Sequence, residues 1–320
     1  MRTAVSLFSG CGGSDLGLAR AGFEILMAND ILEYARDTYL HNMETDYRLG
    51  SVENIRAFPE SDLLVGCYPC QGFSQGGVRE AGRKINYLYR EFDRALRLIK
   101  PKAFIVENVS GMLNSNNQLL LNNQITRFRM AGYKVVYKLL DARFYGLPQE
   151  RKRLFIVGIR SDLGETYDFP EPTHSVEKWN PKLKNTENLP HCPSIGDALS
   201  GMPLWPEGEY VEQDFHWYYL SRDRYRGWDE ASKTIVANCR HMPLHPVSPR
   251  LVKKGPDKWV FDEDRPARRL SYKEGALLQG FPKDFELPDV ANLTKKYTVV
   301  GNAVPPPLFE VVARGMPDIW

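Results

Sequence analysis

The chain has 320 residues, 42% of them hydrophobic, and a formal net charge of +2, which is enough for one large domain or two ordinary ones with a sizeable core. No apolar run reaches the 18 residues of a membrane span, and no charged leader precedes a long apolar region, so we expect neither membrane insertion nor a signal peptide. The five cysteines are scattered and odd in number, which argues against a disulfide framework and favours the cytoplasm.

The first half of the chain alternates strand-like and helical segments. Helices are predicted for 14–22, opened by Ser14 and ended by Gly22, and for 87–100, where apolar residues share one face. Strands are predicted for 3–10, 23–30, 62–69, 103–109, 133–140 and 154–159. This alternation predicts an α/β fold, a Rossmann-like and mostly parallel sheet with helices on both faces and ligands at the carboxyl ends of its strands.

The pattern ends near residue 165. Residues 166–215 are rich in Pro, Asn and acidic groups, and 216–262 carry many aromatics, His and Arg, which predicts an irregular second domain. Order returns with Ser271 and Glu274, which have the spacing of a helix capping box. We therefore expect one domain over 1–170 and 292–320, and a small irregular domain with a return segment over 171–291.

Charge is uneven in the second half. Residues 165–215 hold three Lys and ten acidic residues, whereas 221–270 hold twelve Lys or Arg and seven acidic residues. A local basic surface indicates a polyanion footprint. Chance clustering on a solvated surface gives the same pattern, so charge alone does not decide.

A glycine turn, "LFSGCGGSDLG", follows the first strand. Gly10, Gly12 and Gly13 would let backbone N–H groups approach a ligand at a helix N-terminus. The G-x-G-x-x-G of dehydrogenases is not met, because Asp15 stands where the last glycine would be. Asp30 ends the second strand, where an acidic side chain can hydrogen-bond ribose hydroxyls. The turn therefore suggests an adenosine-containing cofactor without identifying it.

Cys67 and Cys70 form a C-x-x-C pair in "VGCYPCQGFSQGG". A redox pair of the thioredoxin type belongs near the start of a small domain, and a zinc site needs about four ligands that this chain lacks at suitable spacing. Cys70 lies between Pro69 and Gln71, just past a strand end, where a side chain points into the ligand cleft. We therefore favour one nucleophile, Cys70, with Cys67 as a bystander.

Two further segments carry chemistry. Glu107 ends the strand "FIVENV", and a carboxylate at a buried edge suits proton donation at neutral pH, although a capping Glu is a plain alternative. Gln149, Arg151 and Arg153 alternate in "QERKR", so we expect them to face an anionic or nucleobase ligand from one side of an extended segment. A polar lead-in to a strand would look the same.

Six motifs occur in order: "FSGCGG", "GCYPCQGFS", "ENV", "QERKR", "RRLSYKEGALLQGFP" and "GNAVPPPL". Together they resemble the successive motifs of the DNA (cytosine-5) methyltransferases, over nearly the whole chain except about 165–235. The resemblance implies a class I methyltransferase fold and a restriction–modification enzyme that flips cytosine out of the duplex and methylates C5. Residues 221–246, "SRDRYRGWDEASKTIVANCRHMPLHP", resemble bacterial modification enzymes that recognise GGCC.

The resemblance also implies roles for the catalytic residues. Cys70 would add to C6 of cytosine, Glu107 would hydrogen-bond N3 and the exocyclic amine, Arg151 would help to hold the pyrimidine carbonyl, and Arg153 would support the surrounding site. The loop after Cys70 lacks the Asp-x-Arg-Gly that the family usually carries before "LY", so its closure over DNA is expected to differ in detail.

The cofactor implied is S-adenosylmethionine, with no metal. Ser51 stands where relatives often place an adenine-reading Asp. The residues expected to hold the cofactor are Phe8, Gly10, Gly12, Asp30, Ile31, Val52, Pro69, Leu88, Asn302 and Val304.

The partner expected is double-stranded DNA, bound by a monomer. Arginines can bind guanine O6 and N7 in the major groove or only touch phosphates, and the candidates here are Arg222, Arg224, Arg226 and Arg240. An RNA cytosine methyltransferase is a rival, which this arginine-rich middle region disfavours. A non-catalytic nucleic-acid-binding module would be expected to lack Cys70 or Glu107, and an oxidoreductase would be expected to keep the missing glycine.

Overall fold

The computed structural model describes residues 1–69, 87–177, 188–215, 220, 223–256 and 258–320. It divides into two compact units, one of residues 1–141, 152–171 and 308–320, the other of residues 142–151 and 172–307. We expected the second domain to begin at 171 and end at 291. The structure adds 142–151 to it and extends it to 307, because α7 (Leu293–Asn302) packs on α6 (Tyr272–Leu278) of the same unit.

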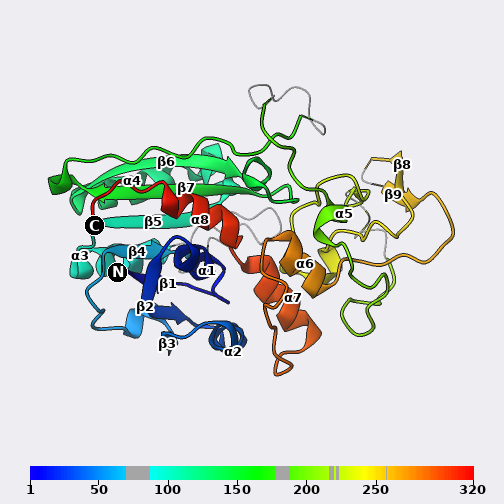
Figure 1. The fold of residues 1–320 in the computed structure, drawn as a ribbon, viewed down its shortest axis with the longest axis horizontal. Coiled ribbons are helices and arrows are strands. Elements are labelled where there is room, and N and C mark those ends of the chain that lie inside the picture. The colour runs from blue at the N-terminus through cyan, green and yellow to red at the C-terminus, as the bar shows by residue number, and fades with distance from the viewer. Residues whose placement is uncertain (70–86, 178–187, 216–219, 221–222, 257) are drawn as a thin grey trace. The chain divides into compact units, whose positions relative to one another are not determined.

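The first unit is built on one seven-stranded sheet with the order β3-β2-β1-β4-β5-β7-β6 (Figure 1). Neighbours from β3 to β5 pair in parallel, and β7 runs antiparallel to both β5 and β6. The mostly parallel α/β sheet predicted from the sequence is thus confirmed. The strands are β1 (Arg2–Leu7), β2 (Phe23–Asp30), β3 (Asp46–Leu49), β4 (Leu63–Gly66), β5 (Ala103–Val109), β6 (Tyr133–Asp141) and β7 (Lys152–Arg160).

Helices cover both faces of this sheet. On one face, α3 (Tyr89–Ile99) and α4 (Gln118–Met130) bury aromatic rings against β5, with Phe104 5.8 Å from Phe92 and 5.0 Å from Phe128. On the other face, Phe309 of α8 (Pro306–Arg314) lies 5.9 Å from Phe155 of β7. Successive strand residues point to opposite faces of the sheet. Because helices cover both faces, the central strands are buried on both sides.

Two further helices flank the first strands: α1 (Gly13–Arg20) and α2 (Glu33–Asn42). Helix α1 begins after Gly12, a left-handed N-cap without a side-chain cap, and not with a Ser14 cap as predicted. The hydroxyl of Ser14 instead donates to Asp15 at 2.9 Å. The start of α1 is therefore set by the backbone of the glycine turn.

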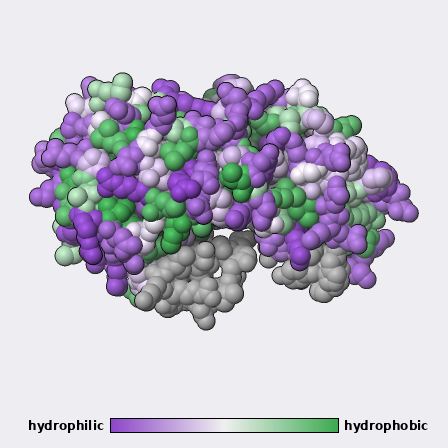
Figure 2. Space-filling model, turned by 90° about the horizontal axis from the view of Figure 1, so that it is seen from below, coloured by the Kyte–Doolittle hydropathy of each residue, from purple (hydrophilic) through white to green (hydrophobic). Residues whose placement is uncertain are grey.

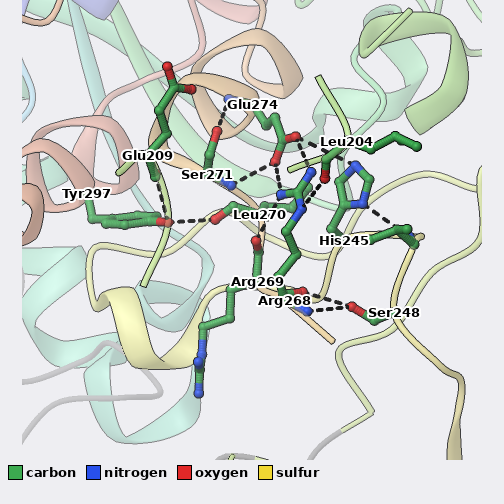
Figure 3. A network of polar contacts seen from close by, with 11 residues as sticks. Leu204, Glu209, His245, Ser248, Arg268, Arg269, Leu270, Ser271, Glu274 and Tyr297 are labelled. Atoms are coloured by element: carbon green, nitrogen blue, oxygen red, sulfur yellow. Dashed lines mark hydrogen bonds and ion pairs between the residues drawn. The ribbon is translucent and has the colours of Figure 1, made fainter. Parts of the chain in front are cut away.

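Among its described residues, the second unit has the helix α5 (Ile195–Ala198), the hairpin β8 (Leu251–Gly255) with β9 (Lys258–Phe261), the helices α6 and α7, and short 3-10 turns. The predicted capping box of α6 is confirmed, since Ser271 and Glu274 each bond the other's backbone. Glu274 also accepts a fork of bonds from Arg268, at 2.8 and 2.7 Å, and both side chains are fully buried (Figure 3). Through Arg268, segments around 204, 245–248 and 268–274 are tied together.

On the face drawn in Figure 2, hydrophobic residues form small areas interspersed with hydrophilic ones. Within the described part of the chain, no helix is both long enough and apolar enough to cross a membrane.

Candidate active site

The turn after β1 has three residues with positive φ: Phe8 (60°), Gly10 (54°) and Gly12 (88°). A side chain at Gly12 would place its Cβ only 2.9 Å from the Tyr39 ring, so both conformation and space require glycine there. At Gly10 an added Cβ would meet no atom within 4 Å. The turn is thus packed tightly behind Gly12 and open beside Gly10.

Asp30, at the end of β2, anchors this turn. Its Oδ2 accepts the Gly10 N–H at 3.0 Å and its Oδ1 accepts the Leu32 N–H at 3.0 Å. Burial raises the pKa of Asp30, and these backbone N–H groups oppose the rise. A carboxylate has about four acceptor positions, so Asp30 can accept a further hydrogen bond from a ligand. The neighbouring Ile31 is 67% exposed, an apolar surface beside that acceptor.

The strand β4 leads into Cys67, Tyr68 and Pro69, and Cys70 itself lies outside the described residues. The Asn108 side chain donates to the Tyr68 carbonyl at 3.2 Å, and the Tyr68 hydroxyl donates to Gln124 at 2.7 Å. Asn108 was not predicted to have a role, although its place directly after Glu107 was a usable signal. These bonds hold the backbone and the side chain of Tyr68 in place.

Burial, reinforced by the nearby Glu107 and Asp15 carboxylates, raises the pKa of the Cys67 thiol well above its usual value. Burial likewise raises the pKa of Cys11, to about 12. Neither thiol ionises readily, and the thiolate is the reactive form of cysteine. Both are therefore poor candidates for a nucleophile.

Glu107 and Arg153 form an ion pair, with Arg153 Nε 2.8 Å from Glu107 Oε1 and both side chains largely buried. Glu107 pairs with Phe155 across β5 and β7, and Arg153 pairs with Val109. Residues two apart on a strand share a face, so the two charged groups are diagonal neighbours. Burial lowers the pKa of the Arg153 guanidinium, and Glu107 counters that shift.

The glycine turn, Asp30, the segment after β4 and Glu107 lie at one edge of the sheet. They do so because β2, β1, β4 and β5 are parallel neighbours whose carboxyl ends share that edge. Phe8 packs edge-on against Tyr68 at 5.9 Å. Val52 is buried at the start of the 3-10 helix η1 (Val52–Asn54), and Leu88 caps α3 and packs on the core. An open glycine turn, a strand-end carboxylate with spare acceptor capacity and an exposed apolar side chain fit a nucleoside-containing cofactor.

The other residues of this prediction belong to the second unit. Asn302 ends α7 and is exposed, whereas Val304 is buried. Arg151 differs from our expectation, because its buried guanidinium donates to the backbone carbonyls of Ile235, Gly301 and Ala303, at 2.9, 3.2 and 2.7 Å. Gln149 is also buried and bonds Ile235 N and Leu278 O. Arg151 and Gln149 thus tie together segments of the second unit.

The predicted DNA-reading arginines differ in their surroundings, and Arg222 lies outside the described residues. Arg224 donates to the His241 carbonyl and contacts its ring. Arg226 pairs with Asp223 at 3.2 Å and lies 3.9 Å from both Glu150 and Glu230. Arg240, in the 3-10 helix η9 (Cys239–His241), has an exposed side chain and a backbone held by Asn238 and Arg269.

Among the residues that the structure covers, no group of three or more His, Cys, Asp or Glu is arranged to hold a metal ion.

Comparison with known proteins gives matches over nearly the whole of this chain. The type II methyltransferase M.MthTI of Methanothermobacter thermautotrophicus is 37% identical, over 97% of this chain and 95% of that protein. M.BsuRI of Bacillus subtilis is 36% identical, over 97% of this chain and 78% of that protein. Both matches extend across the two units of the chain.

Solved structures share the fold. A DNA modification methyltransferase encoded within an Escherichia coli prophage matches with a TM-score of 0.69 and 21% identity, over 98% of each chain. DNMT2 of Spodoptera frugiperda matches with a TM-score of 0.64 and 18% identity, over 97% of this chain and 98% of that one. Residues 2–317 match the model of the C-5 cytosine-specific DNA methylases, and the chain therefore belongs to this family and is a DNA (cytosine-5-)-methyltransferase.

Proposed function

We propose that this enzyme is the modification methyltransferase of a type II restriction–modification system, acts as a monomer on double-stranded DNA and methylates cytosine within GGCC. The resemblance of residues 221–246 to GGCC-specific modification enzymes supports the target. The relatives M.MthTI and M.BsuRI, both type II methyltransferases, support the system.

The observation that carries the catalytic proposal is the Glu107–Arg153 ion pair, one strand away from the segment that leads to Cys70. Cys70 adds its thiolate to C6 of a flipped cytosine, which makes C5 nucleophilic. Glu107 hydrogen-bonds N3 and the exocyclic amine, where charge develops. C5 then takes the methyl group from the donor. After this transfer, a base removes the C5 proton and the Cys70 thiolate leaves C6.

We assign the contact with the pyrimidine carbonyl to Arg153, because Arg153 is the arginine held beside Glu107. Arg151 takes a positioning role in the second unit, since its guanidinium is bonded to three backbone carbonyls there.

The cofactor proposed is S-adenosylmethionine, which supplies the electrophilic methyl group. Phe8, Gly10 and Gly12 shape its site, Asp30 accepts hydrogen bonds from ribose hydroxyls, and Ile31 and Val52 pack against adenine. Pro69 and Leu88 line the methionine side, and the family resemblance also assigns Asn302 and Val304 to cofactor binding. Ser51 caps η1 by accepting the Glu53 N–H at 3.3 Å, so no acidic side chain reads adenine from this position.

Bisulfite sequencing of both the DNA and the RNA of a host that lacks DNA cytosine methylation, with and without expression of this chain, tests the proposal. We expect conversion-resistant cytosines confined to GGCC. A different methylated sequence would overturn the target, and methylation found only in RNA would favour the RNA-modifying alternative.

A further inference from the structure

The carbonyl of Gly10 accepts a hydrogen bond from a side chain that was not expected to contact it. The hydroxyl of Tyr47, on the edge strand β3, donates to this carbonyl at 3.1 Å. On the other side of the same residue, the Gly10 N–H donates to Asp30 at 3.0 Å. Both peptide groups that flank the Gly10 Cα are therefore held by side chains.

Holding these two peptides matters because Gly10 has φ of 54° and open space beside it. Glycine can leave this conformation at little steric cost, so nothing in the residue itself keeps the turn in place. In a trans peptide the N–H points opposite to the C=O. By fixing the Gly10 carbonyl, Tyr47 also fixes the direction of the N–H that follows it in the turn.

The ring of Tyr47 is itself positioned. It packs edge-on against Tyr39 of α2 at 4.9 Å. The hydroxyl of Tyr39 donates to Asp15 Oδ2 at 2.9 Å, and Asp15 Oδ1 accepts from Ser6 and Ser14 at 2.6 and 2.9 Å. Tyr39 and Asp15 are both fully buried, so this chain of contacts reaches from the base of α1 to Tyr47.

We propose that Tyr47 is a positioning residue for the methyl donor, because its hydroxyl holds the Gly10 carbonyl while Asp30 holds the Gly10 N–H, which together keep the glycine turn in the binding conformation. The inference rests on the proposed cofactor site. Tyr47 acts through Gly10, and the buried Asp15–Tyr39 pair fixes the ring that carries the hydroxyl.

The test is Tyr47→Phe, which keeps the ring against Tyr39 and removes only the hydroxyl. Calorimetric titration with S-adenosylhomocysteine should show binding about threefold to tenfold weaker than in the wild type, the factor expected for one ordinary hydrogen bond. Tyr137→Phe is the matched control, because Tyr137 is 44% exposed on β6. Its affinity should equal that of the wild type.

Kinetics separate positioning from general stability. In Tyr47→Phe the KM for S-adenosylmethionine should rise, while the KM for DNA and kcat at saturating donor stay within about twofold. Unchanged affinity for S-adenosylhomocysteine would overturn the inference, and so would a melting temperature lowered by more than about 5 °C. It would also be overturned if the KM for S-adenosylmethionine, the KM for DNA and kcat all became worse by the same factor. If the wild type itself binds no S-adenosylhomocysteine, the proposed cofactor fails instead.

Discussion

The guanidinium of Arg153 lies 2.8 Å from the carboxylate of Glu107 across β5 and β7, with both side chains largely buried. Breaking a buried pair leaves an uncompensated charge, which costs far more than losing an exposed pair. The pair therefore holds its two members in a fixed relation to each other. Such preorganisation is what stabilisation of developing charge on a substrate requires.

Replacing Glu107 by Gln should lower turnover by about 10²-fold or more, because the amide keeps the shape of the side chain but has no charge to pair with Arg153 and cannot exchange a proton with N3 of the cytosine. Affinity for S-adenosylhomocysteine should change little, since Glu107 lies outside the glycine turn. Single-turnover kinetics and calorimetry measure the two effects separately. Glu24→Gln, at an exposed site on β2, is the control, and equal turnover in the two variants would remove Glu107 from the mechanism.

The two cysteines of the C-x-x-C pair should behave oppositely in a trapping experiment. With a duplex containing 5-fluorocytosine and S-adenosylmethionine, the wild type and Cys67→Ser should form a covalent protein–DNA adduct, because burial keeps the Cys67 thiol neutral. Cys70→Ser should form none, and denaturing gel electrophoresis reads the result. An adduct in Cys70→Ser that disappears in Cys67→Ser would identify Cys67 as the nucleophile.

Much of the first unit was predictable, because most of its strands are rich in apolar residues and alternate with helical segments. The strands β1, β2, β4, β5, β6 and β7 and the helices α1 and α3 were anticipated, but α2, α4 and β3 were not. In α2 only Ala35, Thr38 and Tyr39 are buried, so periodicity gave little signal. Tyr47 lies on the missed strand, which is why its contact with Gly10 could not be foreseen.

The partners of charged side chains were the least predictable part of the site. Arg151 and Arg153 alternate in sequence, and we expected both to face a ligand. The chain passes from the second unit to the first between residues 151 and 152. Arg151 therefore bonds carbonyls of one unit and Arg153 pairs with Glu107 in the other, a division that local spacing does not encode.

Binding of the methyl donor should weaken on acidification, because Asp30 becomes protonated. Burial raises the pKa of this carboxyl, so it takes up its proton at a higher pH than an ordinary aspartate and then loses acceptor strength toward the ribose. Titrating S-adenosylhomocysteine into the wild type and Asp30→Asn at several pH values measures this. The variant should bind more weakly at neutral pH with a flatter profile, and identical profiles would contradict the role of Asp30.

The raised pKa of Asp30 affects folding stability in the opposite direction from donor binding. A carboxyl whose pKa is raised in the folded state binds its proton more tightly there than in the unfolded chain, so its contribution to stability falls as the pH rises through that range. A loss of donor affinity at low pH accompanied by an equal loss of folded protein would therefore not come from Asp30.

His245 should make the second unit sensitive to acid. Burial, and then the positive charge of Arg268, lower the pKa of His245 to about 3, and its Nδ1 accepts the Val247 N–H at 3.1 Å, a bond that protonation would break. In the unfolded chain, His245 binds this proton near pH 6.5. The contribution of the neutral His245 to the free energy of unfolding is therefore fully present above that pH and is lost as the pH falls toward 3. Between pH 7 and 5 the loss should be about 2 kcal/mol.

Denaturant unfolding at the two pH values measures this loss. In His245→Gln the difference in stability between pH 7 and 5 should be smaller by about that amount, whereas His191→Gln, at an exposed site in the same unit, should keep the wild-type difference. An equal acid sensitivity of wild type and His245→Gln would show that other groups cause it.

Sequence specificity should depend on Arg240 more than on Arg226. Arg240 is exposed on a backbone held by Asn238 and Arg269, whereas Arg226 is paired with Asp223 and lies near two further carboxylates. Removing an arginine that reads a base costs about 1–3 kcal/mol of binding free energy at one base position, whereas removing a phosphate contact weakens binding to all sequences alike. Arg240→Ala should therefore relax specificity at one position of the site, and Arg226→Ala should lower activity without changing the preferred sequence.

Methylation mapping of both variants on a library of related sites distinguishes the two behaviours. Arg250→Ala, which removes another exposed arginine of the same unit, controls for loss of positive charge, and it should weaken all sites together and flatten the dependence of binding on salt. Arg224→Ala should behave like Arg226→Ala, because the Arg224 guanidinium is bonded to His241. A uniform loss across all sites in Arg240→Ala would reduce this arginine to a phosphate contact and leave base reading to other residues.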